Sequence, residues 1–186
     1  MALRIIAGEF KRRKLRAVRG TQTRPTANRI REAIFNILAL HIRNSCVLDL
    51  FAGTGAFGIE ALSRGADNAV FVDIDSDSIS VLQANIKSLG LESQTKVIRW
   101  DVTKNLNCLL SLGATFNLVF MDPPYNKKMI MPTLTNLHVS QSMVNGSRLI
   151  VEHSNRDPLI TDQLPFEIKD QRPYGKTFVS FLLYEI

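Results

Sequence analysis

The sequence predicts an α/β fold with a mostly parallel sheet. Apolar runs of strand length alternate with segments of helical periodicity between residues 46 and 152. The first run leads into a glycine-rich turn, Gly53-Thr-Gly55-Ala-Phe-Gly58, and then into a helical pattern that stops at Gly65. Strand, glycine turn and helix open a nucleotide-binding βαβ unit. We therefore expect helices on both faces of the sheet and a ligand crevice at the carboxyl ends of its strands.

A strongly basic segment precedes this sheet. Residues 3–7 and 10–18 have the pattern of two short strands, which we expect to form a β-hairpin standing off the main sheet. A length of 186 residues fits one domain with a small appendage. We therefore divide the chain into a basic hairpin arm, residues 1–20, and a main domain, residues 21–186.

The main domain is expected to begin with a helix that has Thr26 as its N-cap. Its apolar residues recur on one helical face, which ends at His41, a residue we assign to the helix end. Seven strands follow, at residues 47–50, 69–73, 96–100, 116–121, 147–152, 165–170 and 177–184. Further helices are expected at residues 59–63, 79–89, 103–111 and 129–139. The last two strands form a hairpin, which makes the seven-stranded sheet mostly parallel.

Composition argues against a membrane protein and against a metal or disulfide framework. Hydrophobic residues make up 45% of the chain, and no apolar run approaches the length of a membrane span. The two cysteines, Cys46 and Cys108, lie far apart, without a C-x-x-C motif or a Cys/His cluster. We therefore expect no bound metal, no membrane association and a location in the reducing cytoplasm.

Positive charge is concentrated at the start of the chain. Residues 1–31 hold ten basic residues and one acidic residue, whereas the rest of the chain has a small acidic excess. A dense run of one sign favours a polyanionic partner such as nucleic acid over a run that only aids solubility. The residues expected to contact phosphate are Lys11, Arg12, Arg13, Lys14, Arg16 and Arg24.

Acidic residues mark the ends of the first two expected strands. Asp49 interrupts the first apolar run, and a carboxylate buried there requires a partner. Asp73 lies 20 residues beyond Gly53, where an acid accepts hydrogen bonds from the ribose hydroxyls of an adenosine. Asp75 is the second candidate for that role, whereas Asp77 fits the first turn of a helix.

Asp101, at the end of the third expected strand, has two interpretations. It either contacts an adenine amino group or caps the helix expected at residues 103–111. The sequence leaves both open.

The fourth strand runs into Asp122-Pro-Pro-Tyr125, the most informative tetrapeptide of the chain. The two prolines have no N–H donors. The tetrapeptide therefore presents hydrogen-bond acceptors, the Asp122 carboxylate and the Pro123 carbonyl, along one edge that is nearly free of donors. Such an edge holds both hydrogens of a ring-conjugated amine and directs the nitrogen lone pair at an electrophile. Tyr125 offers a face on which a flipped-out base stacks. A proline turn with a buried tyrosine is the structural alternative.

These residues carry a family resemblance. The Asp49 to Gly55 stretch, the acid after the second strand and Asp122-Pro-Pro-Tyr125 resemble class I S-adenosylmethionine-dependent methyltransferases, which have a Rossmann-like fold. Residues 4–15, 24–38 and 58–66 narrow the resemblance to the bacterial 16S ribosomal RNA guanine-N2 methyltransferase family. The resemblance spans nearly the whole chain. It implies methylation of one guanine, usually called 966, in the small-subunit RNA.

The resemblance also implies roles for individual residues. The methionine end of S-adenosylmethionine would lie along the segment from Asp49 to Gly55, with Asp49 reaching its ammonium directly or through water. Asp73 would hold the ribose and Asp101 the adenine, and S-adenosylhomocysteine would be the product. The full implied cofactor set is Asp49, Phe51, Ala52, Gly53, Thr54, Gly55, Asp73, Ile74, Asp101 and Val102, and the implied catalytic set is Asp122, Pro123 and Tyr125.

Several alternatives remain at this stage. Asp-Pro-Pro-Tyr fits adenine N6 as well as guanine N2, so an N6-adenine methyltransferase on RNA or DNA is the first. An NAD-dependent oxidoreductase also fits the glycine turn with Asp73, but leaves Asp122-Pro-Pro-Tyr125 and the basic arm without roles. A non-catalytic RNA-binding assembly factor is the third. The expected partner is 16S rRNA within a small-subunit assembly particle, and the expected protein is a monomer.

Overall fold

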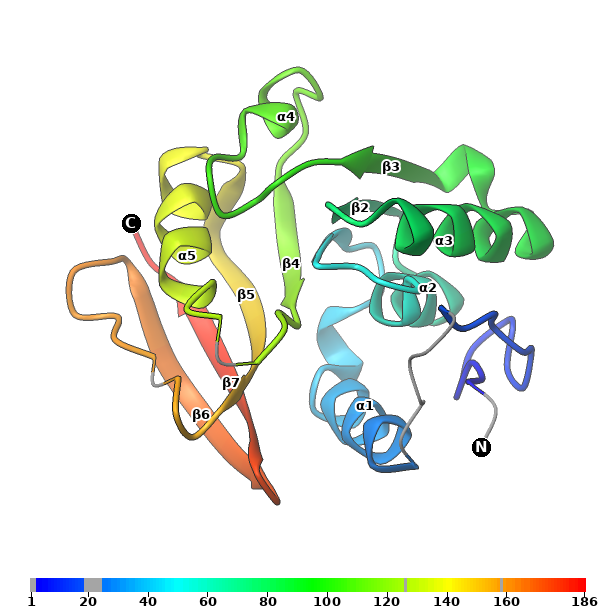
Figure 1. Ribbon diagram of the computed structural model, residues 1–186, viewed down its shortest axis with the longest axis horizontal. Coiled ribbons are helices and arrows are strands. Elements are labelled where there is room, and N and C mark those ends of the chain that lie inside the picture. The colour runs from blue at the N-terminus through cyan, green and yellow to red at the C-terminus, as the bar shows by residue number, and fades with distance from the viewer. Residues whose placement is uncertain (1–2, 19–24, 126, 158) are drawn as a thin grey trace.

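Seven strands form one mixed sheet in the order β3-β2-β1-β4-β5-β7-β6 (Figure 1). The computed structural model describes residues 3–18, 25–125, 127–157 and 159–186, and the side chains of 25–27 are not described. The strands are β1 (Cys46–Leu50), β2 (Asn68–Asp73), β3 (Thr95–Arg99), β4 (Phe116–Met121), β5 (Met143–Ser154), β6 (Phe166–Tyr174) and β7 (Thr177–Tyr184). Strands β1 to β5 pair in parallel, and β7 pairs antiparallel with both β5 and β6. The predicted α/β fold is confirmed.

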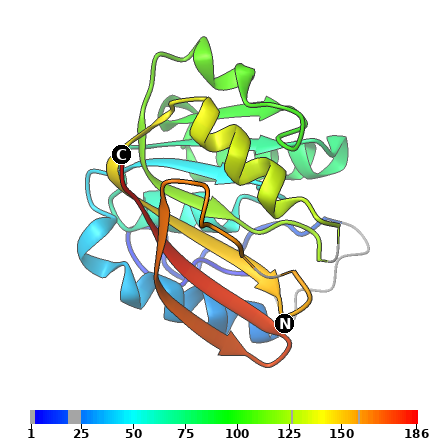
Figure 2. The same cartoon turned by 90° about the vertical axis from the view of Figure 1, so that its left-hand side faces the viewer.

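The helices cover both faces of the sheet (Figures 1 and 2). They are α1 (Pro25–Ile37), α2 (Ala56–Ser63), α3 (Ser76–Leu89), α4 (Asn107–Leu110) and α5 (Ile130–Val139), with short 3-10 turns η1 (Ala39–His41) and η2 (Glu92–Gln94). Helices α1, α2 and α3 pack on one face, and α4 and α5 pack on the other. Among the described residues, no helix has the length and apolar character needed to cross a bilayer.

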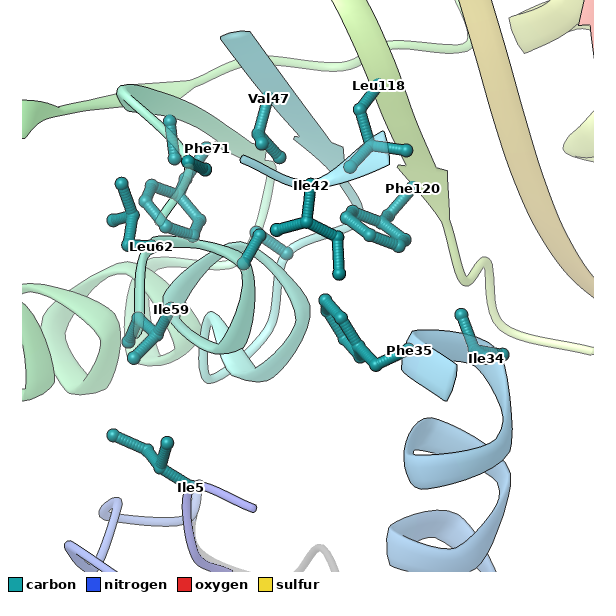
Figure 3. Packing of buried hydrophobic residues seen from close by; sticks show 14 of the residues in the cluster. Ile5, Ile34, Phe35, Ile42, Val47, Ile59, Leu62, Phe71, Leu118 and Phe120 are labelled. Carbon is teal, nitrogen blue, oxygen red and sulfur yellow. The ribbon is translucent and has the colours of Figure 1, made fainter. Parts of the chain in front are cut away.

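Alternating residues of the central strands supply the two cores. In β4, Leu118 and Phe120 belong to the cluster under α1 and α2, and Val119 and Met121 belong to the cluster under α5. This alternation follows from the period of two along a strand. Figure 3 shows the first cluster, in which Phe120 lies beside Ile42 and beside Phe35 of α1, with the two phenylalanine ring centroids 5.5 Å apart. Because both faces are covered, the central strands read as continuous apolar runs in the sequence.

Three predicted helix boundaries are wrong. Helix α1 begins at Pro25, so Thr26 lies inside its first turn and is not the N-cap. Proline suits that position because the first N–H groups of a helix have no intrahelical partner. The helix expected at residues 103–111 is reduced to α4, the single turn Asn107–Leu110. Helix α1 ends at Ile37, before His41, which instead ends the separate η1 turn.

The N-terminal hairpin is present, but a single bridge between Arg4 and Lys14 replaces the two expected strands. Regular strands do not form because a side chain of α2 accepts backbone N–H groups that strand pairing would otherwise use. The buried Glu60 carboxylate accepts the N–H groups of Ile6 and Ala7 at 2.8 and 3.0 Å. Three apolar side chains of the hairpin are buried in the same core as α1 and α2, namely Leu3, Ile5 and Leu15.

The turn of the hairpin approaches α2 so closely that only glycine fits. A Cβ at Gly8, where φ is +81°, would lie 1.7 Å from the carbonyl oxygen of Ser63. The Ser63 hydroxyl accepts the N–H of Phe10 at 3.0 Å and donates to the carbonyl of Ala7 at 2.6 Å. The hairpin therefore packs directly against the helix that follows the glycine turn, and its buried side chains join the core on that face of the sheet.

Candidate active site

The glycine turn between β1 and α2 is built around the buried carboxylate of Asp49. This side chain is 1% exposed, and its Oδ2 accepts the N–H of Gly58 at 2.9 Å. Burial raises the pKa of Asp49 to about 8, although the Gly58 hydrogen bond opposes this change and the nearby Asp73 charge adds to it. Asp49 thus lies beneath the turn with little compensation for a full negative charge, so a cationic ligand group is its natural partner.

Gly58 is required by packing as well as by this hydrogen bond. A Cβ at this position would lie 2.3 Å from Cε1 of Phe71, whose ring is fully buried on β2. The absence of a side chain lets α2 approach the sheet and lets the Gly58 N–H reach Asp49. Helix packing and the hydrogen bond to Asp49 therefore explain why the third position of the motif is a glycine.

The acids after β2 divide into three different roles. Asp73 supports the glycine turn, since its Oδ2 accepts the N–H of Gly53 at 2.7 Å and its Oδ1 accepts the N–H of Asp75 at 2.9 Å. Asp75 is the N-cap of α3, where it accepts both the N–H and the hydroxyl of Ser78, and these bonds lower its pKa. Asp77 is exposed in the first turn of α3, as expected. Asp75 is thus occupied as a cap, while each Asp73 oxygen retains a free lone pair.

A shallow cavity of about 330 Å³ lies beyond Asp73, at the ends of β2 and β3. It is lined by Ile74, Arg99, Trp100, Asp101, Lys104 and Asn105. Ile74 is 55% exposed there, which leaves an apolar surface open to a ring. Asp101 accepts the hydroxyl and the N–H of Thr103 at 2.6 and 3.1 Å, and these bonds lower its pKa. Asp101 therefore stabilises its own turn and caps no helix, because α4 begins only at Asn107.

A second cavity, of about 210 Å³, lies between the glycine turn and the ends of β4 and β5. Its walls come from four parts of the chain: the hairpin, α1, the glycine turn with the start of α2, and the two strand ends. The lining residues are Leu3, Arg31, Phe51, Ala52, Gly53, Thr54, Ala56, Phe57, Asp122 and Glu152. We call this the central cavity. It brings together the sequence-predicted Asp122 and residues 51–54.

The central cavity holds two carboxyl groups side by side. Met121 pairs with Val151 in the parallel register of β4 and β5, so Asp122, which follows β4, lies beside Glu152 of β5. Asp122 is exposed at the open cavity, but desolvation by the surrounding protein raises its pKa well above the ordinary value, and the neighbouring Glu152 and Asp49 raise it further. Burial also raises the pKa of Glu152, against the effect of a hydrogen bond from Tyr125. Two neighbouring acids, one exposed and one half-buried, compete for ionisation, so this pair is suited to accept hydrogen bonds from a ligand amine.

Tyr125 contacts one acid of this pair through its hydroxyl, and its ring is partly exposed. The side chain is 40% exposed, and its hydroxyl donates to Oε1 of Glu152 at 2.5 Å. The hydroxyl also lies 3.0 Å from Oγ1 of Thr177 on β7. Burial and the Glu152 bond raise the pKa of Tyr125, so the phenol stays protonated. Two anchors thus hold the ring in place while one of its faces is available for stacking.

Sequence reasoning missed Glu152, Thr177 and Arg31. Glu152 ends an apolar run in the same manner as Asp73, so the pattern was present in the sequence. Arg31 lies three residues before Ile34 and seven before Leu38, which places it on the buried face of α1. Thr177 has no local signal, because it reaches Tyr125 only through the antiparallel return of β7.

The basic residues of the hairpin lie outside the cavities, on its exposed side. Lys11, Arg12, Arg13, Lys14 and Arg16 are all exposed around the buried Leu15. Arg13 also donates to the carbonyl of Ser88 at 2.7 Å. Arg24 lies outside the described residues. Within the described part of the chain, His, Cys, Asp and Glu side chains form no group of three or more that could hold a metal ion.

The strand order, the glycine turn over a buried acid and the Asp-Pro-Pro-Tyr edge define a class I methyltransferase fold. The family described as Conserved hypothetical protein 95 matches residues 3–183, and this chain belongs to that family. Ribosomal RNA small subunit methyltransferase D of Escherichia coli (strain K12) is 31% identical over 183 residues, which cover 98% of this chain and 89% of the relative.

Solved structures agree with this assignment. The structure of yhhF from Escherichia coli, described there as a methyltransferase candidate, has a TM-score of 0.85 and 30% identity, and covers 100% of this chain and 99% of that one. SMU.776, solved in complex with SAH, has a TM-score of 0.63 and 16% identity, and covers 82% of this chain and 49% of that one. The latter likeness concerns the fold alone.

Proposed function

We propose that this protein transfers a methyl group from S-adenosylmethionine to the exocyclic N2 of a guanine, the 966 type, in 16S rRNA of the small ribosomal subunit. The family relative named as a small subunit methyltransferase supports the RNA substrate. The substrate would be met in the bacterial cytoplasm, as free RNA or within an assembly particle.

The residues around the two cavities fit the proposed cofactor. Asp73 lies between them, with one free lone pair on each oxygen for the two ribose hydroxyls. The exposed Ile74 and the turn at Asp101 and Val102 offer the adenine ring an apolar contact and an acceptor. The glycine turn and Asp49 would receive the amino-acid end. The structure of SMU.776 with SAH supports such a ligand on this fold.

The observation that carries the choice of base is the carboxyl pair of Asp122 and Glu152. Guanine presents N1–H beside its N2 amine, so three donor hydrogens lie along one edge. Adenine presents its N6 amine beside N1, which is a bare acceptor. Asp122 and the Pro123 carbonyl alone serve either amine. The hydrogen bond from Tyr125 favours ionisation of Glu152 over ionisation of Asp122, and an ionised Glu152 accepts the N1–H of guanine and repels the lone pair of adenine N1. The paired carboxyls therefore favour guanine.

The chain's residues act mainly by alignment. When bound, the cofactor supplies an activated methyl group on a positively charged sulfur. Asp122 and the Pro123 carbonyl orient the amine and offset the positive charge that develops on its nitrogen. Tyr125, held by Glu152 and Thr177, stacks on the base and keeps it in plane with these acceptors. Asp122 or water then takes the proton.

The exposed basic side chains of the hairpin would contact phosphate groups of the RNA. Leu3, on the same hairpin, lines the central cavity, so the basic surface adjoins the opening where the base would enter. These contacts carry no base information, and the base is selected in the cavity.

Product analysis tests the proposal. Small-subunit RNA is incubated with labelled S-adenosylmethionine, digested to nucleosides and compared with N2-methylguanosine and N6-methyladenosine standards by chromatography. We expect only N2-methylguanosine and no labelling of duplex DNA. N6-methyladenosine, or labelling of DNA alone, would overturn the substrate assignment and leave the fold unaffected.

Two variants extend this test to the carboxyl pair. Asp122→Asn should lose turnover, and Glu152→Gln should reduce it at least tenfold, with cofactor affinity within threefold of the parent in both cases. Asp67→Asn is the matched control, because Asp67 is exposed and precedes β2 at the opposite edge of the sheet. Full turnover of Glu152→Gln on guanine would contradict the proposed hydrogen bond from guanine N1–H to Glu152.

The remaining classes are separated by simpler measurements. A thermal-shift comparison of S-adenosylhomocysteine with NAD distinguishes a methyltransferase from an oxidoreductase. A labelled-methyl transfer assay distinguishes the enzyme from a non-catalytic assembly factor.

A further inference from the structure

Arg31 is a buried cation that the proposed reaction does not yet use. Its side chain is 4% exposed on α1 and forms part of the wall of the central cavity. One guanidinium nitrogen, Nη2, donates to the carbonyl of Arg4 at 2.5 Å and to Oδ1 of Asn28 at 3.3 Å. Its Nε is buried, and no hydrogen-bond partner is found for it among the described residues. A buried N–H without a partner is costly, which indicates that a ligand completes this site.

The start of α2 lies on the same cavity. Ala56 and Phe57 line it, and the N-cap residue Gly55 has no side chain that could bond to the first N–H groups of the helix. In the part of the chain that the structure describes, the N–H groups of Ala56 and Phe57 have no hydrogen-bond acceptor. The amino end of an eight-residue helix and an unsaturated guanidinium therefore face one cavity, and both favour an anion.

The central cavity is thus polarised. Asp122 and Glu152 supply acidic groups from β4 and β5, while Arg31 and the start of α2 supply positive potential. The charge of the buried Glu60 also acts on Arg31, but the oxygens of Glu60 accept hydrogen bonds from Ile6, Ala7 and Arg64. In the proposed reaction the acidic groups bind the base, so the positive side of the cavity is left for an anion, and the α-carboxylate is the anionic group of the cofactor. We propose that Arg31, together with the N-terminus of α2, binds the α-carboxylate of the amino-acid part of S-adenosylmethionine. This inference rests on the cofactor of the proposed function.

An arginine suits this role better than a lysine because its planar guanidinium holds a carboxylate through two parallel bonds. The bonds to Arg4 and Asn28 position the guanidinium in advance, so little side-chain freedom is lost when the ligand binds. A purely structural Arg31 would tether the hairpin to α1 and would have no preference among ligands.

A pair of ligands that differ only in the carboxylate tests the proposal. Calorimetry measures S-adenosylhomocysteine and S-adenosyl-3-thiopropylamine, which is the same molecule without the carboxylate, on the full chain and on Arg31→Met. We expect the parent protein to prefer S-adenosylhomocysteine about 30-fold, or about 2 kcal/mol. Arg31→Met should lose most of this preference by binding S-adenosylhomocysteine more weakly, with the second ligand unchanged within threefold.

Two further variants make the result decisive. Arg29→Met is the matched control, because Arg29 is an exposed arginine on the same helix and should leave both affinities unchanged. Arg31→Lys keeps the charge and should restore part of the preference, even if Arg31→Met is poorly folded. Equal affinity of the parent protein for both ligands, or an equal loss for both in Arg31→Met, would overturn the proposal. RNA is absent from this measurement, so an error in the proposed base leaves its outcome unaffected.

Discussion

Asp49→Asn should stabilise the ligand-free protein at neutral pH while it weakens cofactor binding. The pKa of Asp49 is raised from 3.8 to about 8, mainly because the side chain is fully buried. The folded state therefore binds the Asp49 proton more tightly than the unfolded chain does. The contribution of this group to stability is fully present below pH 3.8 and is lost as the pH rises toward 8.

The size of the effect on the free energy of unfolding follows from the difference between the folded and unfolded pKa values of Asp49. Between the two pKa values the wild-type protein loses about 1.4 kcal/mol of unfolding free energy per pH unit through this group, and about 6 kcal/mol in total. An asparagine stays neutral at every pH, and its carbonyl still accepts the Gly58 N–H. The difference between Asp49→Asn and wild type should therefore grow by about 3 kcal/mol from pH 5 to pH 7.

Urea unfolding at pH 5, 6 and 7 without cofactor measures this difference. Titrating groups that do not interact with Asp49 are common to both proteins and cancel when the curves are subtracted, whereas Asp122, whose pKa the Asp49 charge raises, contributes a smaller remainder. Asp77→Asn, at an exposed acid in the first turn of α3, is the control and should show no such growth. Parallel stability curves for Asp49→Asn and wild type would refute the reasoning, because they would mean that Asp49 is already ionised in the folded protein.

Three other predictions concern the glycine turn, the ribose site and the arm. Gly58→Ala should lower the free energy of unfolding by about 1–3 kcal/mol in urea, because its Cβ would overlap the buried ring of Phe71; an unchanged value would show that the ring moves aside freely. Asp73→Asn should weaken S-adenosylhomocysteine binding at least tenfold by calorimetry, since the ribose hydroxyls lose a charged acceptor, and equal affinity would remove that role. The double change Lys11→Gln, Lys14→Gln should reduce the slope of log affinity for RNA against log salt by about 1–2, and the same slope as the parent would argue against phosphate contacts there.

The local pattern of apolar residues was sufficient to predict most strands of the sheet. The fourth strand, predicted at residues 116–121, is β4 (Phe116–Met121), and the second differs from β2 (Asn68–Asp73) by one residue. Buried parallel strands show continuous apolar runs, which are visible without any tertiary information. The helix expected at 103–111 was wrong because Asp101 bonds to Thr103 and holds a turn in place of the first helical residues.

The sequence by itself determined the strands of the sheet, the glycine turn, Asp49, Asp73 and the Asp122-Pro-Pro-Tyr125 edge. Each of these depends on neighbours within a few residues, or on the rule that parallel strands deliver their ends to one edge. Tertiary structure alone decided which distant groups complete the site. Glu60 captures the N–H groups of Ile6 and Ala7, which keeps the basic hairpin from forming two regular strands.

Tertiary structure also decided which residues meet in the central cavity. Register between β4 and β5 places Glu152 beside Asp122, and the packing of α1 against the hairpin and the glycine turn brings Arg31 to the start of α2. Neither residue differs locally from many other acids and arginines of the chain. The pKa of an acid and the unsatisfied donor of an arginine are set by the dielectric and by partners from other elements, and the order of residues along the chain carries no direct record of those partners.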